Sequence, residues 1–442
     1  MSLSGYVDYA VKYGLVGRSL LRIERLQSER RARRTNQGAD CVLPPLRARF
    51  RMKELLSRQY LEGNYVNGVR KVAWVATGAP VEVLQALDYF VYYPDNHSAM
   101  CGARKMGVEL AAVAEQAGYS SDICSYPRTE IGAFLSGRSA VGKIPKPDLI
   151  VCSNNICQTV AQWYQVMAAY HGAPFVNIDT PFLYDEPREH DVAYVKRQIE
   201  ELIPVAEKIA GQRLDYRRLR EAVRLGKEAS DLWLQILERA RHRPSPLTAF
   251  DAFVNMGPIV ALRGMPSTVA FYRDMLAEVD ARIAAGAGAV APERMRVLWD
   301  NLPIWYRLNW LWRLLGKQGV NVVLSNYTYG WAELAPVMDA ERPLDSMARV
   351  YLLPYLNRSL RHKLDSMTRM VRDFDLQGVI LHSDRSCKPY SIGQIDQRER
   401  MVNELGVPAL LLEADHNDAR VFSEEQAQAR LDAFVETMES VR

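Results

Sequence analysis

The sequence has 442 residues, of which 48% are hydrophobic and 24% charged, the balance of an ordinary globular protein with two or three domains. Its 56 basic and 52 acidic residues leave a formal net charge of +4, an excess too small to indicate nucleic-acid binding. No run of about 18 apolar residues is present, so we expect no membrane span. The first residues lack a basic leader and include Asp8, which is unlike a signal peptide, so we expect a cytoplasmic protein.

The first 68 residues are charged, and we expect an N-terminal helical segment there. Residues 47–64 have the apolar spacing of an amphipathic helix. The basic cluster at 22–34 is typical of a solvated helix face rather than a binding patch.

Residues 69–190 predict a first α/β domain. Apolar runs ending in polar residues predict strands, and periodic segments between them predict helices. The expected strands are 70–76, 146–155 and 173–179, and the expected helices are 77–90, 105–119 and 156–172.

The second half shows the same alternation of expected strands and helices after a long helical stretch. We expect residues 191–315 to be mostly helical and residues 316–442 to form a second α/β domain. Its strand pattern starts in residues 319–330, further strands are expected at 376–384 and 407–415, and the expected helices are 346–375, 392–406 and 423–440.

A weak internal repeat links the two halves. "PDLIVCSNNIC", a helix and "GAPFVNIDTP" in the first half match "LQGVILHSDRSC", a helix and "GVPALLLEAD" in the second. The pattern predicts two doubly wound parallel-sheet domains of the flavodoxin or Rossmann type, with N-terminal and central helical portions. Ligands bind at the carboxyl ends of the strands in such sheets. Cys157 and Cys387 follow two of these ends, so we expect them to face one cleft.

Several familiar sites are excluded because their motifs are missing. The sequence contains no Gly-x-x-x-x-Gly-Lys-Ser/Thr loop for ATP, and no Gly-x-Gly-x-x-Gly after a strand. It also lacks the Gly-x-Ser-x-Gly elbow, the His-Glu-x-x-His zinc motif and any Cys-x-x-Cys pair.

The cysteines are the remaining candidates for chemistry, and a cytosolic protein of this size does not use them as structural disulfides. Three of them stand in polar, turn-like stretches whose backbone N–H groups can hydrogen-bond to sulfur. Three cysteines from separate loops suit an iron–sulfur cube with one iron open to substrate, whereas inert, packed thiols are the alternative. These three are Cys124, Cys157 and Cys387. We expect Cys41 and Cys152 to be core residues, and Cys101, beside His97, to be able to line the cleft.

At these residues the sequence resembles the benzoyl-CoA reductase / 2-hydroxyacyl-CoA dehydratase family, from about residue 69 to the C-terminus. The matching stretches are "YYPDNHSAMCGARKMG", "DICSYPRTEIG", "KPDLIVCSNNICQTVAQWY", "WDNLPIWYRL", "GVILHSDRSCKPYSIGQ" and "GVPALLLEADHNDARVFSEEQAQARLDAF". The resemblance implies a [4Fe-4S] cluster held by Cys124, Cys157 and Cys387, between the two α/β domains. It also implies an acyl-CoA substrate, a related smaller cluster-binding subunit, and a separate ATP-hydrolysing iron–sulfur activator supplied by ferredoxin.

The resemblance leaves the reaction open. The long chain and the extended "PDNHSAMCGARK" favour the larger subunit of an ATP-dependent reductase of aromatic acyl-CoA, the benzoyl-CoA reductase type. The alternative is a 2-hydroxyacyl-CoA dehydratase subunit that works through a ketyl radical. A double-cubane reductase using the extra cysteines, a non-catalytic electron-transfer subunit and an ordinary α/β binding protein are further alternatives.

Five residues near the motifs are candidates for contact with the substrate. We expect His97 and Tyr390 to be proton donors, with Ser386 as a further candidate for that role. Asn96, Ser386 and Lys388 are the expected substrate-binding residues, with Lys388 a candidate partner of a CoA phosphate.

Overall fold

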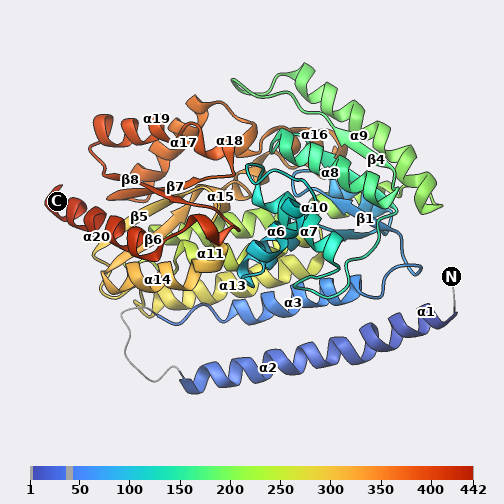
Figure 1. The fold of residues 1–442 in the computed structure, drawn as a ribbon, viewed down its shortest axis with the longest axis horizontal. Coiled ribbons are helices and arrows are strands. Elements are labelled where there is room, and N and C mark those ends of the chain that lie inside the picture. The colour runs from blue at the N-terminus through green and yellow to red at the C-terminus, as the bar shows by residue number, and fades with distance from the viewer. Residues whose placement is uncertain (1–2, 36–42, 442) are drawn as a thin grey trace.

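The computed structural model describes residues 3–35 and 43–441, so Cys41 lies outside the described residues. It confirms the expected fold class, because it contains two four-stranded parallel sheets surrounded by helices (Figure 1). No described helix is both long enough and apolar enough to cross a lipid bilayer.

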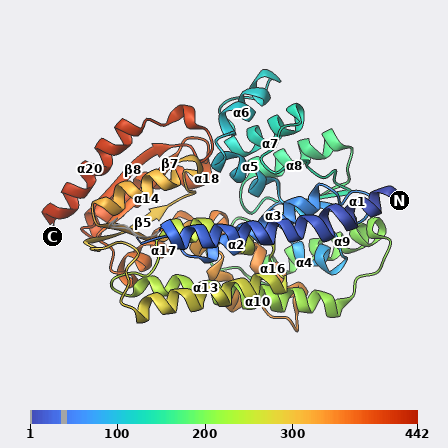
Figure 2. The ribbon, with the colours of Figure 1, turned by 90° about the horizontal axis from the view of Figure 1, so that it is seen from below.

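The N-terminal segment is helical, as expected. Helix α1 (Leu3–Asp8), a π-helix (Tyr9–Gly17) and helix α2 (Arg18–Thr35) run as one rod along helix α3 (Ala48–Gly63) (Figures 1 and 2). Polar contacts hold the rod: the hydroxyls of Tyr9 and Tyr13 donate to the carboxylate of Glu62 at 2.7 and 2.8 Å.

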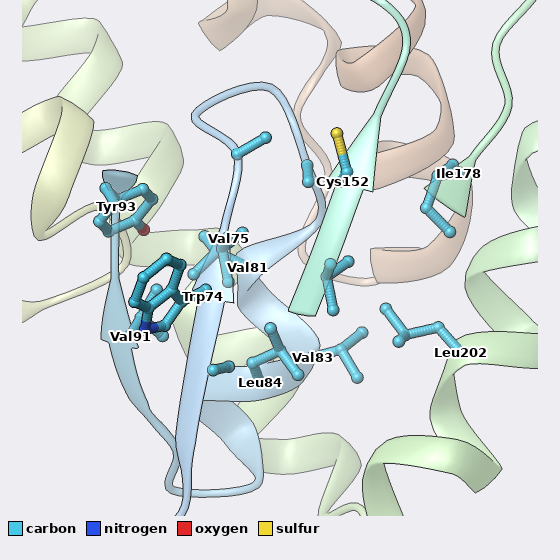
Figure 3. Close-up of a cluster of buried hydrophobic side chains, with 14 of the residues drawn as sticks. Trp74, Val75, Val81, Val83, Leu84, Val91, Tyr93, Cys152, Ile178 and Leu202 are labelled. Atoms are coloured by element: carbon cyan, nitrogen blue, oxygen red, sulfur yellow. The ribbon is translucent and has the colours of Figure 1, made fainter. Parts of the chain in front are cut away.

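The first sheet has the strand order β2-β1-β3-β4, with all strands parallel. Its core surrounds Trp74, whose indole donates to the carbonyl of Pro145 at 2.9 Å, and it includes Cys152 on β3 (Figure 3). The strands are β1 (Val72–Val75), β2 (Phe90–Tyr92), β3 (Leu149–Ser153) and β4 (Phe175–Ile178), and the helices are α4 (Val81–Ala86), α5 (Pro94–Ala103), α6 (Gly107–Gln116), α7 (Ser125–Ser136) and α8 (Gln158–His171).

The second sheet repeats this topology with the order β6-β5-β7-β8, again parallel throughout. In both sheets the third strand in chain order returns beside the first, so the predicted repeat is confirmed. The strands are β5 (Met295–Asp300), β6 (Val320–Ser325), β7 (Gly378–Asp384) and β8 (Ala409–Ala414), and the helices are α14 (Leu308–Lys317), α15 (Asn326–Tyr329), α17 (Leu360–Asp373), α18 (Lys388–Ser391), α19 (Gln394–Glu399) and α20 (Glu424–Val441).

Long helices connect the two sheets. Helix α10 packs against both α13 and α4, and helix α16 packs against α9 beside the first sheet. This central portion comprises α9 (Glu189–Ala210), α10 (Tyr216–Glu238), α11 (Ala249–Asn255), α12 (Gly257–Ala261), α13 (Pro266–Ala284) and α16 (Pro343–Leu352).

Three sequence expectations were wrong in detail. The expected helix at 77–90 ends at Ala86, and strand β2 follows a turn in which Asp88 has φ = 61°. Strand β5 lies within residues 191–315, which were expected to be mostly helical; the sequence analysis missed this strand because the buried Arg296 interrupts its apolar pattern. The expected helix at 346–375 is divided into α16 and α17, because Pro354 lacks the N–H that a continuing helix needs.

The shared topology decides where a ligand would bind. In each sheet the chain reverses its direction of winding between the first and third strands, at β1/β3 and at β5/β7. Ligands of open α/β sheets bind beyond the carboxyl ends of the strands at this switch point. Cys157 follows β3 and Cys387 follows β7, so both lie at the topologically favoured position.

Replacement of Gly132 by Ala tests the packing of α7, the helix that Cys124 precedes. A Cβ at Gly132 would overlap the backbone carbonyl of Leu110 on α6, and a backbone atom cannot move aside as a side chain can. We expect Gly132→Ala to lower the free energy of unfolding by about 1–3 kcal/mol in urea titrations. Gly14→Ala, which meets only ordinary contacts, is the control, and equal effects of both changes would contradict the packing argument.

Candidate functional site: a cavity lined by three cysteines

One cavity of about 400 Å³ lies between the two halves of the chain, and Cys124, Cys157 and Cys387 all line it. Its walls come from both sheets' loops and from helices α3, α11 and α12. The volume lies within the usual range for small-molecule sites. The structure therefore brings together the three cysteines that the sequence singled out.

Each of the three cysteines immediately precedes a helix. Cys124 precedes α7, Cys157 precedes α8 and Cys387 precedes α18. The free N–H groups of a helix N-terminus, and the helix dipole in the two longer helices, favour negative charge and so the thiolate form. Backbone N–H groups of residues 159 and 160 interact with the Cys157 sulfur in this way.

The sulfurs are close enough to influence one another. Burial and the neighbouring charge of Cys124 raise the pKa of Cys157 to about 11. Burial, followed by the charges of Asp384, Cys124 and Cys157, raises the pKa of Cys387 well above its ordinary value. A raised pKa keeps Cys157 and Cys387 as neutral thiols near neutral pH, and a cationic metal group bound between the sulfurs would stabilise their thiolate forms. The donor set therefore fits an iron–sulfur cube with three cysteine ligands.

Behind the cysteines lies a buried polar network that the sequence analysis did not single out. His416, just after β8, is hydrogen-bonded through Nδ1 to the Asp384 carboxylate at 2.6 Å, and its Nε2 lies 3.7 Å from the sulfur of Cys124. The Asp415 carboxylate accepts hydrogen bonds from the hydroxyls of Ser125 and Ser386. The run "EADHND" at the end of an expected strand was the signal that could have identified these residues.

The network has opposite charges at its centre. Burial alone would lower the pKa of His416, but the carboxylates of Asp384 and Asp415 raise it well above its ordinary value. Burial would raise the pKa of Asp415, but His416 and the two serine hydroxyls lower it to about 2. A histidinium between two carboxylates is the consistent charge state.

The ligand atoms of Asp384, Asp415 and His416 lie within 4.8 Å of one another, so these residues could also hold a metal ion. Each of them already has a partner within the protein: Ser386 N–H donates to Asp384, two backbone N–H groups donate to Asp415, and His416 contacts Ser125 at 2.9 Å. We interpret the group as an internal ion network that supports the cysteine loops.

The five residues predicted to contact substrate have different positions. Tyr390 and Asn96 line the cavity, and Tyr390 stacks on Tyr355 with ring centroids 5.6 Å apart. Ser386 is buried behind the lining, where it binds Asp415. Lys388 is exposed, lies outside the cavity lining and donates to the carbonyl of Arg385 at 2.8 Å.

His97 does not line the cavity, although the sequence placed it next to the motif. Its ring is fully buried, with Nδ1 bound to Glu130 and Nε2 bound to Ser139 at 2.9 Å. Cys101 is part of the same buried group, with its sulfur 3.4 Å from His97. Burial would lower the pKa of His97, but Glu130 and Cys101 raise it to about 10. Cys101, which was expected to be able to line the cleft, is not among the lining residues and belongs to the buried core cluster of Leu110.

Asp95, two residues before His97, is a cavity residue that the sequence analysis overlooked. Its carboxylate accepts hydrogen bonds from the hydroxyl of Tyr164 at 3.1 Å and from the Thr77 N–H at 3.2 Å. Burial nevertheless raises its pKa to about 6. A carboxyl that titrates near neutral pH inside a cavity is a candidate acid or base.

The raised pKa of Asp95 predicts a pH-dependent effect on stability. Because its folded pKa of about 6 exceeds the ordinary 3.8, its contribution to stability is greatest below pH 4 and is lost as the pH rises through 6. We expect Asp95→Asn to remove this loss. Between pH 4.5 and pH 8 the unfolding free energy of the variant should therefore rise by about 2 kcal/mol relative to that of the wild type. Urea unfolding at both pH values measures the difference. Asp396→Asn, at an exposed carboxylate, should show no such trend.

The Ser125–Asp415–Ser386 contacts predict energetic coupling between the two halves. Ser125 belongs to the first half and Ser386 to the second, and the Ser125 N–H also donates to the Ser386 hydroxyl at 3.2 Å. A double-mutant cycle of Ser125→Ala and Ser386→Ala should give a coupling energy of roughly 0.5–3 kcal/mol in unfolding free energy. Strict additivity of the two changes would show that the network does not join the halves.

Comparison with known proteins identifies relatives of this arrangement. The chain is 32% identical over 400 residues to the (R)-2-hydroxyisocaproyl-CoA dehydratase alpha subunit of Clostridioides difficile, covering 89% of this chain and 96% of the relative. It is 29% identical to the alpha subunit of the lactoyl-CoA dehydratase of Anaerotignum propionicum, covering 88% and 97%. It is 28% identical to one of the subunits of the benzoyl-CoA reductase of Thauera aromatica, covering 89% and 94%.

The family model of the 2-hydroxyglutaryl-CoA dehydratase D-component matches residues 76–438. The matched range begins just after β1 and includes the other seven strands and all three cavity cysteines. The chain therefore belongs to the 2-hydroxyglutaryl-CoA dehydratase D-component family.

Proposed function

We propose that this chain is the α-type, cluster-binding subunit of a 2-hydroxyacyl-CoA dehydratase. The arrangement of Cys124, Cys157 and Cys387 around one cavity is the observation that carries the proposal. The two dehydratase subunits described above are somewhat more similar to the chain than the benzoyl-CoA reductase subunit is. The comparisons thus support the dehydratase alternative better than the ring reductase that the sequence motifs favoured.

The three cysteines would hold a [4Fe-4S] cluster. When bound, such a cluster supplies an iron without a cysteine ligand, which can act as a Lewis acid on a thioester carbonyl, together with electron transfer at low potential. The helix N-termini before which the cysteines stand provide N–H groups around the sulfurs. The His416 network fixes the loops of Cys124 and Cys387 behind them.

Other residues of the chain would handle protons and exclude water. Elimination of water from a 2-hydroxyacyl group requires a base for a proton and an acid for the departing hydroxyl. Asp95 lies in the cavity with a pKa of about 6, so it can hold or release a proton near neutral pH. Tyr390 also lines the cavity, and burial raises the pKa of its hydroxyl and keeps it protonated as a hydrogen-bond donor.

The relatives are named as subunits of larger enzymes, two of them as alpha subunits, which supports a complex with a partner chain. We propose that this partner is the smaller cluster-binding subunit that the resemblance implies. The separate ATP-hydrolysing activator and its ferredoxin belong to the same proposal, consistent with the absence of a Walker loop in this chain. A cytoplasmic location stays a prediction.

Anaerobic purification with iron and sulfide analysis tests the cofactor. We expect about four irons per chain for the wild type. Cys387→Ser should lose most of this iron and its EPR signal, because one of the three ligands is gone. Cys152→Ala, which removes a thiol buried on β3, is the control and should keep the iron. An iron-free wild-type chain in an active enzyme would contradict the proposal.

Product analysis separates the two reactions. The complete enzyme with its partner subunit and activator should convert a 2-hydroxyacyl-CoA to the 2-enoyl-CoA, as seen by mass spectrometry. Reduction of benzoyl-CoA without any dehydration would instead assign the chain to the aromatic-ring reductases.

A further inference from the structure

The cavity has a large apolar wall that does not belong to the cysteine loops. It is formed by helices α3, α11 and α12, whereas the cysteines precede α7, α8 and α18. Most of its side chains are buried in the protein and touch the cavity with carbon and sulfur atoms. The wall consists of Met52, Leu56, Phe253, Met256 and Val260.

The positively charged side chains in the cavity lining are not available to form an ion pair with a buried anion. Among the described lining residues, only Lys53, Arg104 and His416 can be cationic. Lys53 is exposed and paired with Glu24 at 2.7 Å, and Arg104 is exposed to solvent. His416 is bound to the Asp384 carboxylate. A carboxylate buried against the apolar wall would be unpaired, which is strongly unfavourable.

The polar groups that remain in the lining suit a neutral ligand. Several of them are uncharged hydrogen-bonding side chains, among them Ser57, Thr77 and Asn96. Hydroxyl and amide groups can donate to a carbonyl oxygen, which a thioester and the amides of its CoA arm provide. Asp95, the acidic lining residue, would repel an anionic acyl chain and not a neutral one.

From this wall we infer that the enzyme selects a large, uncharged apolar acyl group, branched aliphatic or aromatic, and rejects small and carboxylate-bearing ones. The inference rests on the proposed function and specifies its substrate class. The cavity of about 400 Å³ extends from the cysteines to the apolar wall, so a methyl-sized side chain would leave the wall uncovered. Each methylene missing from an apolar pocket lowers kcat/KM by roughly 10–200-fold.

A substrate series on the complete enzyme, with partner subunit and activator, tests the selection. We expect kcat/KM for (R)-phenyllactyl-CoA or (R)-2-hydroxyisocaproyl-CoA to exceed that for lactoyl-CoA at least 10-fold, on the scale of a lost methylene. The kcat/KM for these apolar substrates should exceed that for 2-hydroxyglutaryl-CoA roughly 100-fold or more, because the cavity would have to bury the carboxylate of 2-hydroxyglutaryl-CoA. Equal or better use of lactoyl-CoA or 2-hydroxyglutaryl-CoA would overturn the inference.

Calorimetric binding to the same enzyme without its activator distinguishes this result from failure of the proposed function. Tighter binding of the apolar thioesters, together with no dehydration by the complete enzyme with its activator, would refute the dehydratase and leave the selection intact. Tighter binding of 2-hydroxyglutaryl-CoA would refute the selection, whatever reaction follows.

Two lysine substitutions test the wall directly. Met52→Lys places a cation on the wall at a half-buried position, and Ser57→Lys does so at a half-buried lining position that is already polar. Each should shift the kcat/KM ratio at least 10-fold toward 2-hydroxyglutaryl-CoA while circular dichroism and iron content stay unchanged. Ile395→Lys, at an exposed site on α19, is the matched control. The inference would be overturned if both lysine variants fold and keep their iron but show an unchanged kcat/KM ratio.

Discussion

The Asp415 carboxylate is the contact on which the geometry of the site depends. Its two oxygens accept hydrogen bonds from Ser125 and Ser386, the residues that adjoin Cys124 and Cys387 in sequence. These serines belong to different halves of the chain, so one buried anion joins the two loops that carry Cys124 and Cys387. The charge of Asp415 is balanced by His416, which also faces the sulfur of Cys124. The network is thus both a structural bridge and the electrostatic environment of the cysteines.

The repeated sheet topology makes this bridge possible. In both halves the third strand lies beside the first, which opens a binding position at the same edge of each sheet. Cys157 and Cys387 leave equivalent strands at that edge and are followed by helices. The third cysteine, Cys124, is supplied from outside the repeat by the loop before α7. A three-cysteine site therefore arises from a twofold pattern and one additional loop.

The contrast between the two sides of the cavity explains how one site can combine charge with a preference for apolar groups. Ions and hydrogen-bond donors are gathered behind the cysteines, where they are bound to one another. The wall from α3, α11 and α12 offers hydrocarbon and thioether surface. Exclusion of water by this wall strengthens the electrostatic interactions on the other side, because the local dielectric constant is low. Asp95 lies in this environment, which accounts for its raised pKa.

The sequence by itself determined the fold class, the repeat and the three cysteines, because these depend on local apolar patterns and on turns that follow strands. It failed at β5, whose strand pattern is interrupted by Arg296; this guanidinium is satisfied by the carbonyls of residues 240, 242 and 374, which are distant in sequence. Only the tertiary structure decided that Asp95 faces the cavity while His97, two residues later, faces Glu130 in the core. Neighbours on a helix point in different directions, and what each one meets is set by elements packed from elsewhere in the chain.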